Sequence, residues 1–191
     1  MAKQSNKILI LTGHSGAGKD AVSAELRKQS TFTALTPHTT RAMRENEEEG
    51  NPYYFISEPE FISLIKNNEL IEYADYRTMF NGIPATAYYG TAYSSIPQSG
   101  NSVITIGVLA AIALKRKLGS KATLVYLDVP DSVREARAKQ RGSFDQVEWD
   151  NRLAQDHARF KDGLPDGIDI TIDNTQPITT VVSTILNKIK E

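Results

Sequence analysis

The chain has 191 residues, and 40% of them are hydrophobic, so it is long enough to bury the core of one domain of ordinary size. Its 22 lysine and arginine residues balance 23 aspartate and glutamate residues, which excludes a global positive field that would attract nucleic acid or an anionic membrane. The absence of cysteine excludes disulfides, thiolate metal sites and cysteine nucleophiles, and three scattered histidines argue against a zinc cluster.

The apolar segments of the sequence are short. The run near the N-terminus, Ile8–Leu11, is too brief for the hydrophobic region of a signal peptide. The longest apolar stretch, Val103–Leu114, falls well below the roughly 20 residues that a membrane span needs. We therefore expect a cytoplasmic protein with neither a membrane nor a nucleic acid as its partner.

Apolar, strand-like runs alternate with helical patterns along most of the chain. Strands are predicted over residues 7–11, 102–106, 122–128 and 168–172, and a helix is predicted after each of them, over 19–28, 109–117, 131–140 and 177–190. This order is typical of parallel strands joined by crossover helices. The strands are apolar nearly throughout, as in a sheet that is covered on both faces. The sequence therefore predicts an α/β fold with a central parallel sheet flanked by helices.

The character of the sequence changes between residues 33 and 92. Tyrosine and phenylalanine gather there, polar and apolar residues alternate, and only one helix is predicted, over 59–67. We predict a small mixed α/β lobe, 33–92, inserted into a single domain, 1–191, whose core comprises 1–32 and 93–191.

A glycine-rich loop follows the first predicted strand, and a helical pattern begins directly after it. The loop reads Gly13-His14-Ser15-Gly16-Ala17-Gly18-Lys19-Asp20, and all but its last position satisfy the P-loop signature. In such a loop the backbone N–H groups wrap the phosphates, the helix N-terminus adds a favourable dipole, and the lysine reaches the β and γ oxygens. The sequence therefore predicts ATP binding by Gly13, Ser15, Gly16, Ala17, Gly18, Lys19 and Asp20.

Asp20 stands where a P-loop usually has a serine or threonine whose hydroxyl binds Mg²⁺. A carboxylate can also ligate Mg²⁺, directly or through water, so one interpretation makes Asp20 a metal ligand and Mg²⁺ the cofactor. The other interpretation is that Asp20 caps the following helix and interacts with its positive end. Both interpretations fit the sequence.

A second candidate anion site lies within the predicted lobe. Arg41 and Arg44 follow Thr39-Thr40, and Tyr53 lies a short distance downstream. Two guanidinium groups beside a tyrosine hydroxyl can form a forked clamp for a monophosphate. The sequence thus predicts two phosphate sites, one in the core and one in the lobe.

Taken together, these motifs resemble those of guanylate kinase. The shared features are the phosphate loop, Thr39-Thr40-Arg41 with Arg44, then Gly50, Tyr53 and Phe55, then Ile71-Glu72, and then Tyr88-Tyr89-Gly90-Thr91. They occur in the family's order and spacing over nearly the whole chain. The resemblance implies a P-loop kinase with an inserted monophosphate-binding lobe and an arginine-bearing lid. It also implies the reaction, in which ATP phosphorylates a purine nucleoside monophosphate, GMP or dGMP.

The resemblance further implies roles for individual side chains. Arg41, Arg44, Tyr53 and Tyr89 would hold the acceptor phosphate, and Glu72 and Thr91 would read the guanine edge. Arg137, Arg141 and Arg152 reproduce the arginine spacing of the family's lid, residues 137–152, and with Lys19 and Arg41 would stabilise charge on the transferring phosphoryl group. We expect small-molecule nucleotides as partners and a monomer or homodimer.

The chain departs from the family pattern near the acceptor and the metal. Pro37 or His38 replaces a serine that touches the base, and Thr105 and Gly107 stand where the family carries two acidic residues. The segment Arg77–Ala87 is several residues longer than usual. This longer loop either closes over the base, reshapes the pocket or is simply exposed.

These departures keep other interpretations open. They fit a monophosphate kinase with a shifted acceptor preference, for example for deoxy or modified purines. Guanylate kinase-like domains also serve as non-catalytic protein-binding modules, but those typically lack a working phosphate loop, whereas Lys19 and the loop glycines are intact here. The loss of the strand acids and the presence of Asp20 are either linked, with Asp20 supplying the carboxylate for Mg²⁺, or they mark weakened activity.

Overall fold

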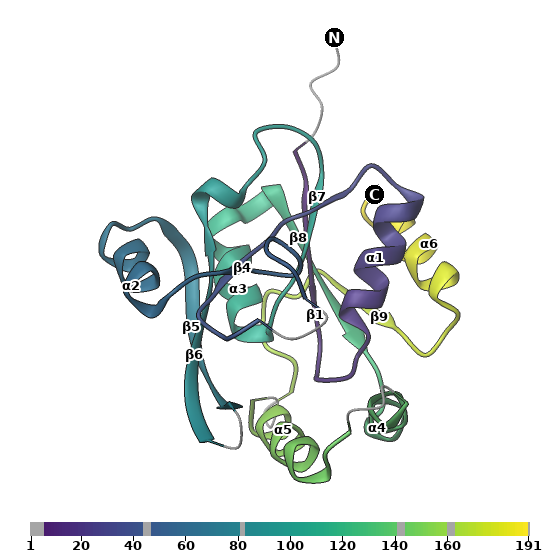
Figure 1. Cartoon of the computed structure of the whole chain (residues 1–191). Coiled ribbons are helices and arrows are strands. Elements are labelled where there is room, and N and C mark those ends of the chain that lie inside the picture. Colours follow the sequence, from purple (N-terminus) through teal and green to yellow (C-terminus); the bar gives the residue numbers. More distant parts are fainter. Residues whose placement is uncertain (1–5, 44–46, 81–82, 141–143, 160–162, 191) are drawn as a thin grey trace.

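The core of the molecule is a five-stranded parallel sheet. The computed structural model, shown in Figure 1, describes residues 6–43, 47–80, 83–140, 144–159 and 163–190. The strand order is β2 (Thr33–Ala34), β7 (Ser102–Thr105), β1 (Ile8–Thr12), β8 (Ala122–Asp128) and β9 (Ile170–Asp173). Every pairing in this sheet is parallel. All residues of the central strand β1 are buried, which explains its almost wholly apolar sequence.

Successive side chains of β1 face opposite sides of the sheet, and each side packs against its own helices. Leu9 and Leu11 belong to a buried cluster that includes side chains of α1 (Lys19–Gln29) and α6 (Ile178–Lys188). The isoleucines of the same strand belong to a second cluster, with α3 (Val108–Leu118). Helices therefore cover both faces of the sheet (Figure 1).

Two further helices, α4 (Asp131–Lys139) and α5 (Gln146–Arg159), lie beyond the carboxyl ends of the core strands (Figure 1). The loop that joins β1 to α1 lies at this same end of the sheet. In open α/β sheets, ligands bind outside the carboxyl ends of the strands. Short 3₁₀ helices occur at η1 (Tyr93–Ser95) and η2 (Gly119–Lys121).

A second sheet, of four strands, forms the inserted lobe. Its order is β4 (Tyr54–Phe55), β3 (His38–Thr39), β6 (Ile83–Ala92) and β5 (Leu70–Phe80). β5 and β6 form a long antiparallel hairpin, while β3 runs antiparallel to β6 and parallel to β4. The helix α2 (Glu58–Lys66) precedes β5, and Ser57 and Glu60 form a capping box at its start.

The α/β fold with a central parallel sheet is confirmed, and each predicted core strand and helix is present with its ends shifted by at most a few residues. The first residues of the predicted lobe, Thr33 and Ala34, pair with β7 and so belong to the central sheet. Within the described ranges, no helix is long and apolar enough to cross a membrane.

Two elements differ from the sequence-based expectation. The segment 77–87 was expected to be a long loop, but most of it continues the paired strands of the β5–β6 hairpin. The helix α5 has no counterpart among the predicted helices, although the lid predicted over 137–152 includes its first half. Both elements depend on partners that lie elsewhere in the chain: β5 pairs with β6, and α5 contacts the loop that precedes α1.

Candidate active site

The predicted phosphate loop joins β1 to α1 at the carboxyl end of the sheet. Gly18, the residue before the helix, has a φ of 85°, a left-handed conformation that favours glycine. A Cβ atom on Gly13 would lie 2.8 Å from the carbonyl oxygen of Leu127 in β8, so only glycine lets the loop pass this close to the sheet. The backbone geometry therefore requires glycine at both positions.

The ammonium group of Lys19, at the start of α1, lies against the loop. Its Nζ donates to the carbonyl oxygens of Gly13, at 3.0 Å, and of His14, at 3.1 Å. These bonds keep the positive charge beside the loop, where a lysine that binds the β and γ oxygens has to be.

The carbonyl oxygen of Ala17 is held by side chains from outside the loop. Asn174 Nδ2 donates to it at 2.6 Å, and Arg137 Nη1 at 3.5 Å. Arg137 Nη2 also donates to the backbone carbonyl of Asn174, at 2.7 Å. Arg137, predicted as a lid arginine, thus contacts the phosphate loop. Asn174 was missed, although its place directly after the core strand β9 was an available signal.

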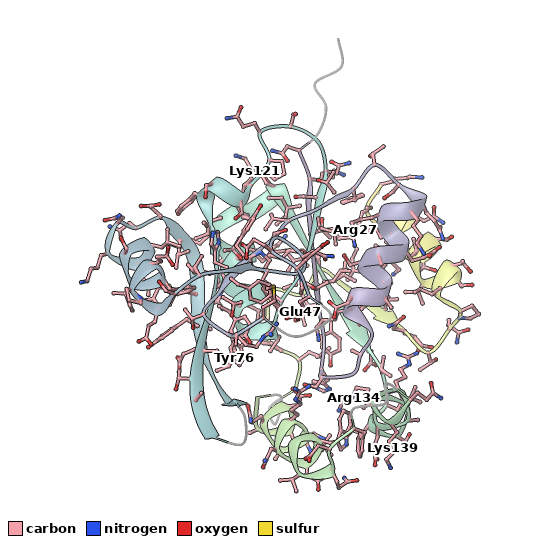
Figure 2. All side chains as sticks on the ribbon, viewed as in Figure 1. Arg27, Glu47, Tyr76, Lys121, Arg134 and Lys139 are labelled. Carbon is pink, nitrogen blue, oxygen red and sulfur yellow. The ribbon has the colours of Figure 1, made fainter. Side chains whose placement is uncertain are left out.

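The backbone of Ser15 is held by a buried ion pair that the sequence analysis also missed. Asp156 in α5 accepts a hydrogen bond from Ser15 N–H at 2.9 Å, and Arg134 in α4 donates to the Ser15 carbonyl at 2.7 Å. Figure 2 shows Arg134 between α4 and the loop that precedes α1. No motif marks this pair, because a single arginine or aspartate on a helix is usually exposed.

Asp20 is exposed and occupies the second position of α1. Gly18 is the N-cap residue, so Asp20 is not the cap, although its charge lies in the first turn, where the helix dipole favours it. Asp20 Oδ1 accepts a hydrogen bond from Thr105 Oγ1 at 3.0 Å. Because Thr105 ends β7, the Asp20 carboxylate reaches the place where the family pattern has an acidic residue.

The surroundings of Asp20 suit Mg²⁺ rather than a metal held by protein ligands alone. Among the residues that the structure describes, no group of three His, Cys, Asp or Glu side chains is placed to hold a metal ion. Mg²⁺ needs no such group, because it usually binds one or two carboxylates and completes its shell with substrate phosphates and water. An exposed carboxylate beside a phosphate loop meets this requirement.

Arg41 is the centre of a second cluster, in the inserted lobe. Its guanidinium donates to both carboxylate oxygens of Glu47, at 2.9 and 2.8 Å, and lies 5.5 Å from the ring centres of Tyr53 and Phe55. The rings of Tyr53 and Tyr89 pack edge to face, with centres 5.5 Å apart. Three predicted ligands of the acceptor phosphate, Arg41, Tyr53 and Tyr89, are therefore brought together.

The Tyr53 hydroxyl of this cluster lies in buried surroundings that keep it neutral. Burial is the main cause that raises the pKa of Tyr53, and electrostatic interaction with Tyr89 and Asp20 raises it further. The Tyr53 hydroxyl stays protonated and is able to donate a hydrogen bond to an anion.

Glu72 and Thr91 form a buried pair on the paired strands of the lobe. Thr91 Oγ1 donates to Glu72 Oε1 at 2.6 Å, and Glu72 is only 7% exposed. The other carboxylate oxygen, Oε2, is buried and has no hydrogen-bond partner among the described residues. Burial raises the pKa of Glu72 to about 7, against the opposing effect of the hydrogen bonds from Thr91. The two predicted base-reading residues are thus together, with one acceptor oxygen unpaired.

Tyr76 extends the same face of the lobe toward the core. It lies four residues beyond Glu72 on β5, and side chains at even spacing share a face of a strand. Its ring packs edge to face on Tyr89, with centres 5.4 Å apart. A Cβ atom on Gly107 would lie 2.5 Å from the Tyr76 hydroxyl. The hydroxyl therefore occupies the space beside Gly107, where the family pattern has an acidic side chain. Figure 2 labels Tyr76 and Glu47 in this part of the molecule.

The remaining predicted residues belong to the lid and the arginine clamp. Arg152 is an exposed residue of α5. Arg44 and Arg141 lie outside the described residues, so their roles stay predictions.

The sequence of the chain is similar to known guanylate kinases over nearly its whole length. A family model described as guanylate kinase matches residues 5–185. A guanylate kinase of Wolbachia pipientis wMel is 32% identical over 191 residues, which cover 97% of this chain and 92% of the relative. A guanylate kinase of Chlorobium chlorochromatii (strain CaD3) is 30% identical over 192 residues, covering 96% of each protein.

The fold agrees with that of a solved structure. The crystal structure of guanylate kinase from Anaplasma phagocytophilum matches with a TM-score of 0.67 at 20% sequence identity, covering 98% of this chain and 86% of that chain. Fold, family model and full-length relatives agree, and the chain belongs to the guanylate kinase family of transferases.

Proposed function

We propose that this enzyme transfers the γ-phosphoryl group of ATP to the phosphate of GMP or dGMP. The proposal rests chiefly on the Glu72 carboxylate, which is buried in the lobe with one oxygen unpaired among the described residues. Leaving such an acceptor without a donor is costly, so the arrangement favours a ligand that supplies one. Membership of the guanylate kinase family supports the same reaction.

Guanine supplies the donors that Glu72 lacks. An ionised carboxylate only accepts hydrogen bonds, and guanine presents its N1 hydrogen and exocyclic amino group side by side on one edge. Adenine presents an unprotonated N1, which would set lone pairs against lone pairs. Thr91 Oγ1 fixes the carboxylate from its other oxygen, so Glu72 has a defined orientation toward the base.

The phosphates of the two nucleotides would be held at separate clusters. The phosphate loop and Lys19 bind the triphosphate, while Arg41, Tyr53 and Tyr89 bind the acceptor phosphate, with Arg44 as a further ligand. Arg137, Arg141 and Arg152 would stabilise the charge that spreads over the transferring phosphoryl oxygens. Glu47 holds the Arg41 guanidinium in place before the substrate arrives.

Asp20 is the protein group proposed to hold Mg²⁺, directly or through water. The ion would neutralise charge between the donor phosphates when bound. The hydrogen bond from Thr105 orients the Asp20 carboxylate, and a carboxylate at this position offsets the loss of the acids that the family carries at the end of β7. This arrangement favours linked changes over weakened activity.

A shifted acceptor preference is not favoured by the family and its relatives, and the feature of this chain that bears on it is the Tyr76 hydroxyl beside Gly107. A neutral hydroxyl there would contact the acceptor differently from a carboxylate. The protein-binding module is not favoured, because the phosphate loop and Lys19 have the geometry of a nucleotide site and the relatives matched over the full length are guanylate kinases.

The experiment is to measure ADP release with Mg²⁺ and ATP for GMP, dGMP, AMP, CMP and UMP in turn. We expect release with GMP or dGMP and none above background with AMP, because sites built on such hydrogen bonds reject the wrong partner by roughly 10⁴ or more. The Glu72→Gln variant should narrow the difference between GMP and AMP, since its amide can donate to adenine N1. Preference of the unaltered enzyme for AMP or a pyrimidine nucleotide would refute the role of Glu72.

A further inference from the structure

Two charged side chains, one from α4 and one from α5, form hydrogen bonds with the backbone of the loop residue Ser15. Its N–H donates to Asp156 Oδ2 at 2.9 Å, and its carbonyl accepts from Arg134 Nη1 at 2.7 Å. The same two side chains bond to each other, at 3.2 Å. Both polar groups of one loop residue are therefore fixed by a single ion pair that joins α4 to α5.

This ion pair is removed from water. Arg134 is 0% exposed and Asp156 is 6% exposed. Arg134 also bonds Asp131 on its own helix and lies 5.8 Å from the ring centre of Trp149 in α5. Asp156 depends on this pair, because a buried carboxylate without its cation is costly, whereas Arg134 would keep Asp131 as a partner. Moving α5 away from the loop would break the pair.

The loop lies directly on the two helices at this point. A Cβ atom on Gly16 would come within 3.0 Å of the backbone oxygen of Arg134 and 3.4 Å of the Trp149 ring. The contact with α5 thus involves Trp149 as well as Asp156. Of the α5 side chains that the structure describes, these two alone are buried.

The positions of the two contacts determine which way α5 faces. Trp149 and Asp156 are seven residues apart, so they lie on the same face of the helix, about two turns apart. Arg152 lies between them, three residues after Trp149 and four before Asp156, and therefore on this face. Rotation of α5 that moved this face away from the loop would break both contacts.

We propose that Arg134 and Asp156 are positioning residues, which hold α5 on the phosphate loop and thereby direct Arg152 toward the phosphoryl group that is transferred. The proposal rests on the proposed function, in which Arg152 touches that group. In the loop, the side chains of Arg134 and Asp156 hydrogen-bond to the backbone of Ser15. Their effect on the reaction would pass through Arg152.

The test is a double-mutant cycle of kcat with Asp156→Asn and Arg152→Met. We expect Asp156→Asn to lower kcat strongly, because misplacement by about 1 Å can cost roughly 10²-fold, and to leave the KM for GMP nearly unchanged. In the Arg152→Met background, Asp156→Asn should cause little further loss. Independent losses that multiply, or a kcat of Asp156→Asn equal to that of the unaltered enzyme, would overturn the proposal. Asp150→Asn, an exposed change on the same helix, is the matched control and should leave kcat unchanged.

A second variant separates positioning from folding. Arg134→Met combined with Asp156→Leu replaces the buried ion pair by apolar side chains, which proteins often tolerate without loss of stability. We expect this protein to unfold near the temperature of the unaltered enzyme, with kcat as low as that of Asp156→Asn. A kcat equal to that of the unaltered enzyme would show that the ion pair contributes packing alone and does not position Arg152.

Hydrogen exchange at the Ser15 amide keeps this proposal separate from the proposed function. The amide should be protected in the unaltered protein and exchange faster in Asp156→Asn, whether or not GMP is a substrate. Equal exchange in both proteins would overturn the anchoring of α5. Absence of transfer to GMP, with protection still lost in the variant, would count against the proposed function alone.

Discussion

The chemistry of Glu72 follows from its place in the protein. Burial raises its pKa from an ordinary value of 4.5 to about 7, so near neutral pH the free enzyme holds both protonated and ionised forms. Only the ionised form has two acceptor oxygens for guanine. Binding of GMP should therefore release a proton when it starts from the protonated form.

This shift predicts a pH dependence of stability. Because the folded-state pKa lies above the unfolded value, the stability linked to protonation is fully present below pH 4.5 and is lost as pH rises through about 7. Urea unfolding of Glu72→Gln and of the unaltered enzyme should show a difference that grows in favour of the variant from pH 5 to pH 8, by roughly 3 kcal/mol at most. A difference that stays constant across this range would contradict the raised pKa.

Asp20 provides a second prediction at the level of single residues. Asp20→Asn removes the charge near the proposed metal while keeping the size of the side chain. The Mg²⁺ concentration for half-maximal rate should rise about tenfold or more, since changes around a metal ligand typically cost that much affinity. Glu25→Gln, on the same helix but away from the loop, is the control. If Asp20→Asn lowers the unfolding temperature and leaves the Mg²⁺ dependence alone, its charge serves the helix rather than the metal.

Among the structural elements, the β5–β6 hairpin departs most from the family pattern. Tyr76 reaches from β5 to the N-terminus of α3, where its hydroxyl takes the space above Gly107. The hairpin therefore contacts the core through a side chain whose ring also packs on Tyr89. A change at Gly107 in the core should therefore alter the packing of the proposed acceptor cluster of the lobe, which includes Tyr89.

We predict that Gly107→Ala destabilises the enzyme by about 1 kcal/mol or more, the lower end of the usual cost of overpacking. The added Cβ would clash with the Tyr76 hydroxyl, so the cost should fall in the Tyr76→Phe background, which lacks that hydroxyl. Any preference for glycine at the N-cap of α3 is common to both backgrounds and cancels in the comparison. Equal unfolding free-energy changes in the two backgrounds would contradict the contact.

The elements also show how far the sequence predicts the structure. The core helices could be predicted because they bury apolar side chains at helical spacing, such as Val22 and Leu26 in α1. The helix α5 differs from α1 in what it buries, because its described buried side chains are the single aromatic Trp149 and the charged Asp156. An ion pair and an aromatic contact hold it, and hydrophobic periodicity does not report either one.

The same distinction applies to the candidate site. Residues that are neighbours in sequence could be predicted, and residues that are distant in sequence could not. The phosphate loop could be predicted since its glycines and Lys19 are neighbours in sequence, and their spacing reflects local backbone geometry. The residues that support the loop are distant in sequence, with Ser15 and Arg134 separated by 119 positions. The extended pairing of β5 and β6 likewise depends on cross-strand partners that sequence patterns specify weakly.

At the scale of the whole molecule, the reaction requires the two phosphate clusters to meet. The proposed acceptor cluster lies in the segment that carries the second sheet, and the phosphate loop follows a strand of the central sheet. We therefore expect the lobe and the predicted lid, 137–152, to move toward the core when both nucleotides bind. Closure would exclude water and so prevent wasteful hydrolysis of ATP.

Small-angle scattering should report this closure. The radius of gyration should fall when GMP and a non-transferable ATP analogue are both present, and fall less with either one alone. An unchanged radius with both ligands bound would count against closure as part of the mechanism.

In the proposed reaction, one phosphoryl group passes from ATP to GMP at the site formed by the phosphate loop and Glu72. Phosphorus NMR of a mixture of enzyme, Mg²⁺, ATP and GMP follows that group directly. We predict that ADP and GDP appear in equal amounts, and that folded Lys19→Ala forms neither, because the lysine stabilises charge on the donor phosphates. Formation of ADP and inorganic phosphate without GDP, or undiminished transfer by Lys19→Ala, would contradict transfer to GMP at this site.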